Sequence, residues 1–336
     1  MTLIGSIWSR IDRFLAAILL TVAFATVMPA RGDAAVAVGW LTDAAIALLF
    51  FMHGAKLSPE VALLGARHWR LHTMVFLSTF ALFPLLGISA RFLAPGFLPG
   101  PLWTGVILLT ALPSTVQASI AFTSVAGGNV PAALCSASAS NLLGVFLTPL
   151  IAGFLLTRHG LDISARSVLA IVMQLLLPFV AGQLLRPWIG AYLTRHPRAL
   201  KSVDYGSVLI LVYAAFSHGV VDGICHQIGA GDLFKVALVD IALLAAVMAI
   251  LTFGSRQLGF SRADEIAIVF CGSKKSLVNG VPIATLLFAG HVGLVVIPLM
   301  VFHQIQLMVC ASRARYYAAR RITASEPLPG LPATST

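Results

Sequence analysis

Charged side chains are scarce in this chain of 336 residues, of which 10% are charged and 59% hydrophobic. An ordinary soluble domain carries about 25% charged residues, so the composition excludes that class of protein. The HExxH, GxSxG and Walker A motifs and any clustered Cys/His set are also missing, so we expect neither an enzyme nor a cofactor. The four cysteines form no disulfide framework, and the net charge of +10 is spread singly rather than in a patch for nucleic acid.

Apolar runs of membrane-spanning length are abundant instead. A spanning helix needs about 20 mainly apolar residues, and runs punctuated by Pro, Gly and charge predict ten spans in an all-α polytopic membrane protein. The predicted spans are 14–30, 39–57, 71–93, 102–126, 129–156, 167–190, 203–224, 233–258, 264–288 and 292–312. An alternative for the first run is a cleavable signal peptide, since Arg10 and Arg13 precede it.

Basic residues between these spans are distributed unevenly. With the N-terminus in the cytoplasm, fifteen lie on the cytoplasmic side and five on the other. The positive-inside rule therefore predicts that both termini are cytoplasmic. Residues 322–336, rich in Pro, Ser and Thr, are expected to form a disordered tail.

The ten spans divide into two sets of five, residues 13–157 and 165–313. An odd number of spans per set turns the two halves in opposite directions across the membrane, which is an inverted repeat. The motif Phe51-Met52-His53-Gly54 returns as Phe216-Ser217-His218-Gly219. Each histidine is interpreted first as a hydrogen-bonded structural residue and second as a ligand.

Polar residues interrupt spans four and nine near the middle of each. A broken helix frees backbone groups that hydrocarbon cannot satisfy, and paired breaks in corresponding positions indicate a transport site. The alternative for each is a proline kink whose hydroxyls bond back to the helix. The candidate binding residues are Ser114, Thr115, Gln117 and Ser119 in span four and Ser273, Lys274, Lys275, Ser276 and Asn279 in span nine.

Two adjacent lysines in span nine are the least expected residues in a membrane. A lysine at mid-membrane costs about 3 kcal/mol on insertion scales. We expect Lys274 or Lys275 to face a cavity, where it would hold an anionic substrate or stand where a coupling cation binds. The alternative is an ion pair with Asp240 in span eight.

Spans five and ten supply further candidates. Ser138 and Asn141 in span five could offer oxygens to an ion or substrate, and His303 and Gln306 lie in the equivalent region of span ten. The alternatives are close helix packing by the small residues of span five and an interhelical hydrogen-bond network in span ten.

The run from Pro113 to Asn129, together with the broken span nine, resembles the bile acid:sodium symporter family. Residues 50–57, 270–276 and 302–306 resemble its bacterial "bile acid symporter-like" subgroup, which is related to solute carrier family 10 member 7. The resemblance implies a bacterial inner membrane protein with a panel domain of spans 1, 2, 6 and 7. It also implies a core domain of spans 3–5 and 8–10, in which the broken spans cross. Such proteins move organic anions, often with sodium, by alternating access.

The sodium ligands that the resemblance implies are only partly present. Ser119 matches a hydroxyl ligand, so a sodium ion near Ser119 is one expectation, but the other ligand positions have lost their oxygens. The family's Asn, Glu, Gln, Asn and two hydroxyl ligands are replaced by Ile120, Phe270, Lys274, Lys275, Ala133 and Ala137. An ammonium group supplies the charge that sodium supplied, so coupling to protons, to another ion or to none stays open.

Two hypotheses follow. The first is a secondary active transporter for a small organic anion, with its site at the two breaks. The second, motivated by the missing sodium ligands, is a non-transporting membrane regulator or scaffold that retains the transporter fold.

Overall fold

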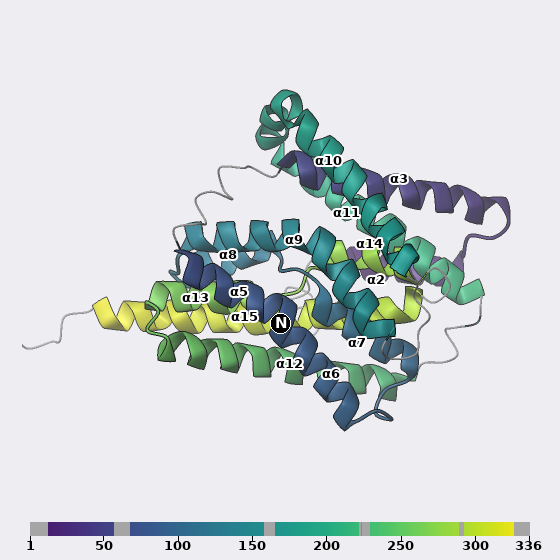
Figure 1. The fold of residues 1–336 in the computed structure, drawn as a ribbon. Helices are drawn as coiled ribbons and strands as arrows, with labels where there is room; N and C mark the ends of the chain where they lie inside the picture. Colours follow the sequence, from purple (N-terminus) through teal and green to yellow (C-terminus); the bar gives the residue numbers. More distant parts are fainter. Residues whose placement is uncertain are drawn as a thin grey trace, which may run out of the picture.

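Helices make up the described part of the chain, which in this computed structural model comprises residues 13–56, 68–157, 165–221, 223, 229–288 and 292–325 (Figure 1). No strand occurs within these ranges. The elements are α2 (Arg13–Val27), α3 (Asp33–Lys56), α5 (Trp69–Leu77), the π-helical turn η2 (Ser78–Leu82), α6 (Phe83–Leu93), α7 (Gly100–Ala111), α8 (Val116–Val125), α9 (Val130–Thr157), α10 (Ala165–Arg195), α11 (Pro197–Val221), α12 (Ala230–Gln257), α13 (Arg262–Gly272), α14 (Leu277–Leu287) and α15 (Val292–Ser325).

Each predicted apolar span coincides with one helix or with consecutive helices. In the described ranges, eight helical segments are long and apolar enough to cross a membrane, and the bent pair α7–α8 makes a ninth. The apolar part of α2, Ala16–Val27, is shorter. The all-α polytopic class is therefore confirmed, while the ten-span inverted repeat stays a prediction.

Several helix boundaries differ from the predicted ones, and α3, for example, begins at Asp33 rather than at 39. α11 begins at Pro197 rather than at 203, and α15 runs through Ser325 rather than ending at 312. Ala and Arg between 311 and 321 are strong helix formers, which explains why α15 continues beyond its apolar part. The predicted disordered tail thus begins inside a helix, and residues 326–336 lie outside the described part of the chain.

The first apolar run is built into the bundle. Phe14 and Ile18 of α2 are buried, and the Phe14 ring stacks on that of Tyr205 in α11, with centroids 3.9 Å apart. The Tyr213 hydroxyl donates to the Met28 carbonyl at 2.9 Å. These contacts favour a structural span over the alternative of a signal peptide.

The helices form two groups, which Figure 1 shows at an angle to each other. The four-helix group contains α2, α3, α10 and α11, in which α3 packs on α10 and α11, and α11 packs on α2. The larger group contains η2 and the remaining helices, held together by pairs such as α7–α15, α12–α15 and α8–α13. The two groups meet where α9 touches α10 and where α14 and α15 touch α11.

Candidate functional site

Two interrupted helices meet inside the larger group. α7 and α8 are bent by 64° at their break, where Pro113 has no N–H to continue the helix. α13 ends at Gly272 and α14 begins at Leu277. The two breaks touch directly, because the Ser276 N–H donates to the Pro113 carbonyl at 2.9 Å. The segment 262–287 is enclosed by protein, with 94% of its most apolar window buried against 22% for that of α10.

Side chains of neighbouring helices replace the lost helical hydrogen bonds of the first break. The Ser114 N–H donates to Ser140 Oγ at 3.0 Å, and Asn141 Nδ2 donates to the Ser114 carbonyl at 2.8 Å. The Thr148 hydroxyl donates to the Ala111 carbonyl at 2.9 Å. All three side chains come from α9, whose polar residues therefore support the break as well as packing closely.

The second break is held in a similar way by α15. Gln306 accepts from the Lys275 N–H through Oε1 and donates to the Lys275 carbonyl through Nε2, both at 2.9 Å. Its Nε2 also lies 3.2 Å from His303 Nδ1. Asn279 Nδ2 donates to Asn141 Oδ1, which joins the two breaks through side chains. The alternative of a hydrogen-bond network in span ten is therefore present in the structure.

The Lys275 ammonium group lies among carbonyl oxygens at the crossing. Its Nζ donates to the carbonyls of Thr79 and Thr110 at 2.7 Å and to that of Leu112 at 2.8 Å. An ammonium has three N–H donors, so all three are used. Nζ also lies 4.3 Å from the centroid of the Phe83 ring.

One proline and the end of a helix explain why these carbonyls are available. In η2 the Phe83 N–H bonds to the Ser78 carbonyl, and the next donor in that π spacing would be Pro84, which has no N–H. The Thr79 carbonyl is therefore left for Lys275. Thr110 and Leu112 lie at the C-terminal end of α7, where carbonyls lack helical donors and a positive charge is favourable.

Lys274 is enclosed a short distance away. Its Nζ donates to the Ala118 carbonyl at 2.7 Å and lies 4.0 Å from the centroid of the Phe122 ring and 5.4 Å from that of Phe270. Both lysine side chains are buried, at 0% and 1% exposure. Neither lines the cavity described below, which differs from the expectation that one of them faces it.

Asp240 is not the charge partner of these lysines. It is fully buried in α12, and neither of its carboxylate oxygens has a hydrogen-bond partner among the described residues. The described ion pairs likewise include none between Asp240 and a lysine. The lysines are satisfied by carbonyls and aromatic rings instead.

The Asp240→Asn variant should be at least as stable as the wild type, with a difference of no more than about 1 kcal/mol. The amide keeps the shape of the side chain and removes a group whose ionised form is unpartnered in the described structure. Thermal unfolding in detergent would measure the difference. Glu265→Gln is the matched control and should destabilise, because Glu265 accepts from Arg256 at 2.9 and 3.0 Å and from Tyr317 at 2.8 Å. A clear loss of stability in Asp240→Asn would instead reveal a partner for the carboxylate.

A cavity of about 450 Å³ lies between the two groups of helices. Its walls come from α2, α3, α10 and α11 on one side and from α8, α9, α14 and α15 on the other. Of the candidate residues predicted from sequence, the lining includes Thr115, Gln117, Ser138, Asn141, Ser276, Asn279 and His303. It does not include Ser114, Ser119, Ser273, Lys274, Lys275 or Gln306, which are buried at or beside the crossing.

Ser119 is occupied by protein contacts at the position where the resemblance implied a sodium ligand. Its hydroxyl donates to the Phe270 carbonyl at 3.1 Å and lies 3.4 Å from the hydroxyls of Ser114 and Thr115. Among the described residues, no group of three or more His, Cys, Asp or Glu side chains is placed to hold a metal ion.

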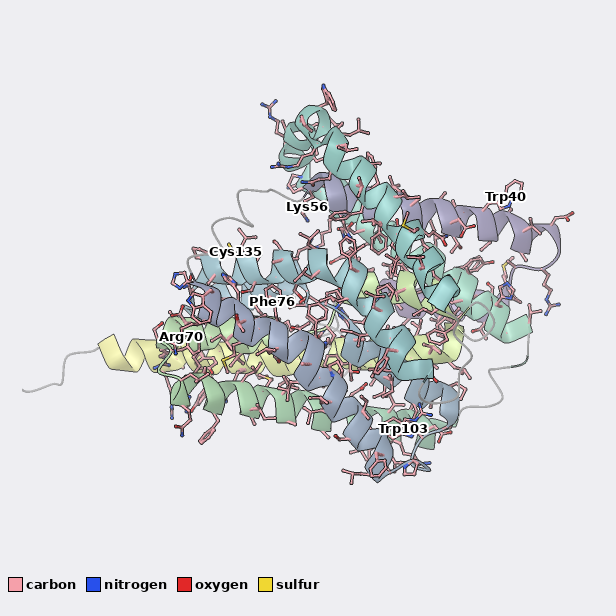
Figure 2. The ribbon with its side chains drawn as sticks, in the orientation of Figure 1. Trp40, Lys56, Arg70, Phe76, Trp103 and Cys135 are labelled. Atoms are coloured by element: carbon pink, nitrogen blue, oxygen red, sulfur yellow. The ribbon has the colours of Figure 1, made fainter. Side chains whose placement is uncertain are left out.

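The four-helix group contributes ionisable residues that sequence reasoning underrated or missed. Lys56, at the end of α3, and Asp204 and Tyr205 in α11 line the cavity together with His53. Figure 2 shows Lys56 at the end of α3, on the side that faces α9. The sequence analysis did not single out Asp204, which lies next to residue 203, where the predicted span seven begins. In the structure it lies in the second turn of a helix that begins at Pro197.

Electrostatics favour a single negative charge in this cavity. The N-termini of α8 and α14 both lie at its wall, and a helix N-terminus attracts anions. Lys56 and Asp204 also line the cavity, and their opposite charges cancel. The rest is mostly apolar, with Phe14, Leu134, Leu142 and Phe179 among the lining side chains.

A model of the SBF-like CPA transporter family matches residues 12–319. The chain belongs to the SBF-like CPA transporter family.

Individual relatives of the chain agree with the family. It is 52% identical over 308 residues to the "Putative symporter YfeH" of Escherichia coli (strain K12), covering 91% of this chain and 93% of that protein. It is 50% identical over 323 residues to the "Uncharacterized protein PA2026" of Pseudomonas aeruginosa, covering 96% and 97%. It is 26% identical over 309 residues to the "Sodium/bile acid cotransporter 7" of Danio rerio, covering 89% and 91%. The predicted resemblance is confirmed, and the protein is a multi-pass membrane protein of a transporter family.

Proposed function

We propose that this protein is a secondary active transporter that carries a small organic anion by alternating access and does not use sodium. The observation that carries the proposal is the cavity between the four-helix group and the larger group, at whose wall the two breaks meet. In the proposed cycle the four-helix group is the panel and the larger group is the core that moves against it. The interface between them is then the transport path.

The orientation of the cavity follows from the positive-inside rule. With cytoplasmic termini, the end of α3 at Lys56 and the start of α11 near Asp204 lie on the cytoplasmic side. Both residues line the cavity. The structure then represents an inward-facing state in the inner membrane, and transport requires an outward-facing counterpart.

The residues at the crossing do not fit a sodium ion. The carbonyls at the C-terminal end of α7 bind the Lys275 ammonium, and the Ser119 hydroxyl is bonded to the Phe270 carbonyl. Sodium requires several oxygen ligands, whereas the side chains that replace the family's ligands are Ile120, Phe270, Ala133, Ala137 and the two lysines. In this proposal the lysines hold the two breaks together.

The size and chemistry of the cavity indicate the substrate class. A volume of about 450 Å³ lies within the usual range for small-molecule sites. Apolar walls with two helix N-termini suit an amphipathic anion with one negative charge, since the charges of Lys56 and Asp204 cancel each other. Asn141, Ser138 and Gln117 would orient its polar atoms.

Uptake by proteoliposomes tests this function. A panel of radiolabelled organic anions, including taurocholate, would be offered with sodium or with N-methyl-D-glucamine as the external cation. We expect uptake of at least one anion at the same rate in both, because a resident ammonium group takes the place of the sodium ion. Uptake that requires sodium would contradict the proposal, and no flux for any anion would favour the regulator or scaffold.

A variant that fills the cavity distinguishes uptake through the cavity from leakage of the anion across the lipid. Ser138→Trp places a large ring in the lining of the cavity and should reduce uptake at least tenfold. Leu150→Trp on the same helix is the control, because Leu150 is 52% exposed and lies outside the lining.

A further inference from the structure

A histidine and an aspartate face each other across the four-helix group, on the wall of the cavity. His53 Nε2 of α3 lies 3.7 Å from Asp204 Oδ1 of α11. Asp204 is 7% exposed, and its Oδ1 accepts no hydrogen bond from the described residues. A buried carboxylate oxygen at this distance from an imidazole is placed to stabilise the protonated ring. Both side chains line the cavity.

The charged side chains in the lining of the cavity cancel each other. Lys56 and Asp204 are the charged side chains in the described lining, so with neutral histidines their sum is zero. His303 of α15 also lines the cavity and bonds to Gln306 through Nδ1. Lys201, on the same helix as Asp204, lies over the Tyr205 ring, 5.1 Å from its centroid. The arginines of α10, Arg186 and Arg195, lie outside the lining.

Protonation of His53 therefore gives the lining of the cavity a net positive charge. The lining goes from a net charge of zero to +1, which favours an anion beside it. Histidine is the side chain whose charge changes most readily near neutral pH. If a proton raises the affinity for an anion, the anion raises the affinity for the proton by the same factor.

We propose that His53 and Asp204 form a proton-binding site that couples anion transport to the proton gradient, with one proton carried for each monovalent anion. The inference rests on the proposed transport function. A proton from the cavity water binds the His53 imidazole, Asp204 holds the imidazolium, and the anion binds to the positively charged cavity. After the core moves, anion and proton leave together, so the cycle carries no net charge.

The position of the pair distinguishes it from the other ionisable residues. Asp240 is buried in α12 and does not line the cavity, so cavity water has no direct access to it. His218 occupies the matching position in the repeated motif but is exposed and also lies outside the lining. His218→Gln is therefore a matched control for His53→Gln.

Taurocholate is the probe for the transport test, because its sulfonate keeps one negative charge between pH 5 and 8. Proteoliposomes loaded with the pH indicator pyranine would receive an inward taurocholate gradient at equal internal and external pH. We expect the lumen to acidify in the wild type and in His218→Gln. An imposed membrane potential should not change the rate. Taurocholate uptake without acidification would overturn the proposal.

Taurocholate binding to the protein in nanodiscs tests whether His53 and Asp204 form the proton site. In the wild type, taurocholate affinity should fall about tenfold per pH unit once the histidine is neutral. His53→Gln and Asp204→Asn should each make the affinity nearly independent of pH between 6 and 8. A full pH dependence in both variants would overturn the assignment.

A measurement without substrate separates this inference from the transport function. Nitrogen-15 NMR of histidine-labelled protein identifies His53 as the signal that His53→Gln lacks. We expect that signal to titrate and its midpoint to move to lower pH in Asp204→Asn. A His53 signal that does not titrate would overturn the proton site. If the wild type neither binds nor carries taurocholate but His53 titrates as expected, the proton site is supported and the failure lies with taurocholate as a substrate of the proposed transport function.

Discussion

Replacing Lys275 with Met should destabilise the protein by about 3–5 kcal/mol, the largest effect we expect from a polar substitution in this chain. Methionine keeps much of the length and apolar character of the lysine side chain but has no donor. The carbonyls of Thr79, Thr110 and Leu112 would then lose a partner in a fully buried place. Thermal unfolding in detergent, compared at constant ionic strength, would measure the loss.

Lys275→Ala tests the idea that the ammonium replaces a cation. The truncated side chain leaves three carbonyl oxygens around a space that a hard cation such as sodium could enter. We expect sodium chloride to raise the unfolding temperature of Lys275→Ala relative to N-methyl-D-glucamine chloride, since a ligand at 100 times its Kd stabilises by about 2.7 kcal/mol. The wild type should be indifferent to the choice of cation.

Lys235→Ala is the control for both substitutions. Lys235 pairs with Asp232 at 3.3 Å, and its side chain is 42% exposed, so its loss should change stability by about 0–1 kcal/mol. If Lys275→Met is as stable as the wild type, the three carbonyls have other partners and the resident-cation interpretation is wrong.

The sequence was sufficient to predict where the apolar helices lie and where two of them break. Apolar runs and prolines are local signals, and they placed the breaks at 113–119 and 272–280, close to those observed. Membrane helices also satisfy their own backbone groups, so length and hydropathy predict them well. Helix ends were less certain, because nothing in an amphiphilic sequence such as 197–203 marks where the apolar span begins.

The direction of the lysine side chains could not be predicted from sequence. In a continuous helix, spacing fixes which residues share a face, but Lys274 and Lys275 lie in a non-helical segment between α13 and α14. The π-helical turn before Pro84 leaves the carbonyl of Thr79 without a helical donor, and the sequence does not predict such a turn. The sequence analysis expected the buried lysines to need compensating contacts, but it did not identify the carbonyls and rings that supply them.

The proximity of His53, Lys56 and Asp204 in the four-helix group was missed for a different reason. His53 and Lys56 belong to the motif at the end of span two, and Asp204 lies at the start of span seven, about 150 positions further along the chain. Their proximity depends on how α3 packs against α11, which no local pattern encodes. The matching motif at His218 indicated an internal repeat, but it did not predict the contact between His53 and Asp204.

Gly54→Leu should prevent the four-helix group from assembling, with a loss of at least about 3 kcal/mol. A Cβ atom at Gly54 would overlap the carbonyl of Phe179 in α10, and one at Gly182 in α10 would overlap the carbonyl of Phe51 in α3. The two helices therefore touch backbone to backbone through a reciprocal pair of glycines, as small residues allow in membranes. A backbone carbonyl cannot swing aside as a flexible side chain does.

The measurement is the yield of monodisperse protein after detergent extraction, followed by thermal unfolding of what remains. Gly182→Leu should behave like Gly54→Leu because it enters the same contact from the other helix. Gly39→Leu, also on α3, is the matched control, since no atom lies within 4 Å of a Cβ placed there. Equal yields for Gly39→Leu and Gly54→Leu would mean that α3 and α10 do not meet at these glycines. The positions of His53 and Lys56, which flank Gly54, would then have to be revised as well.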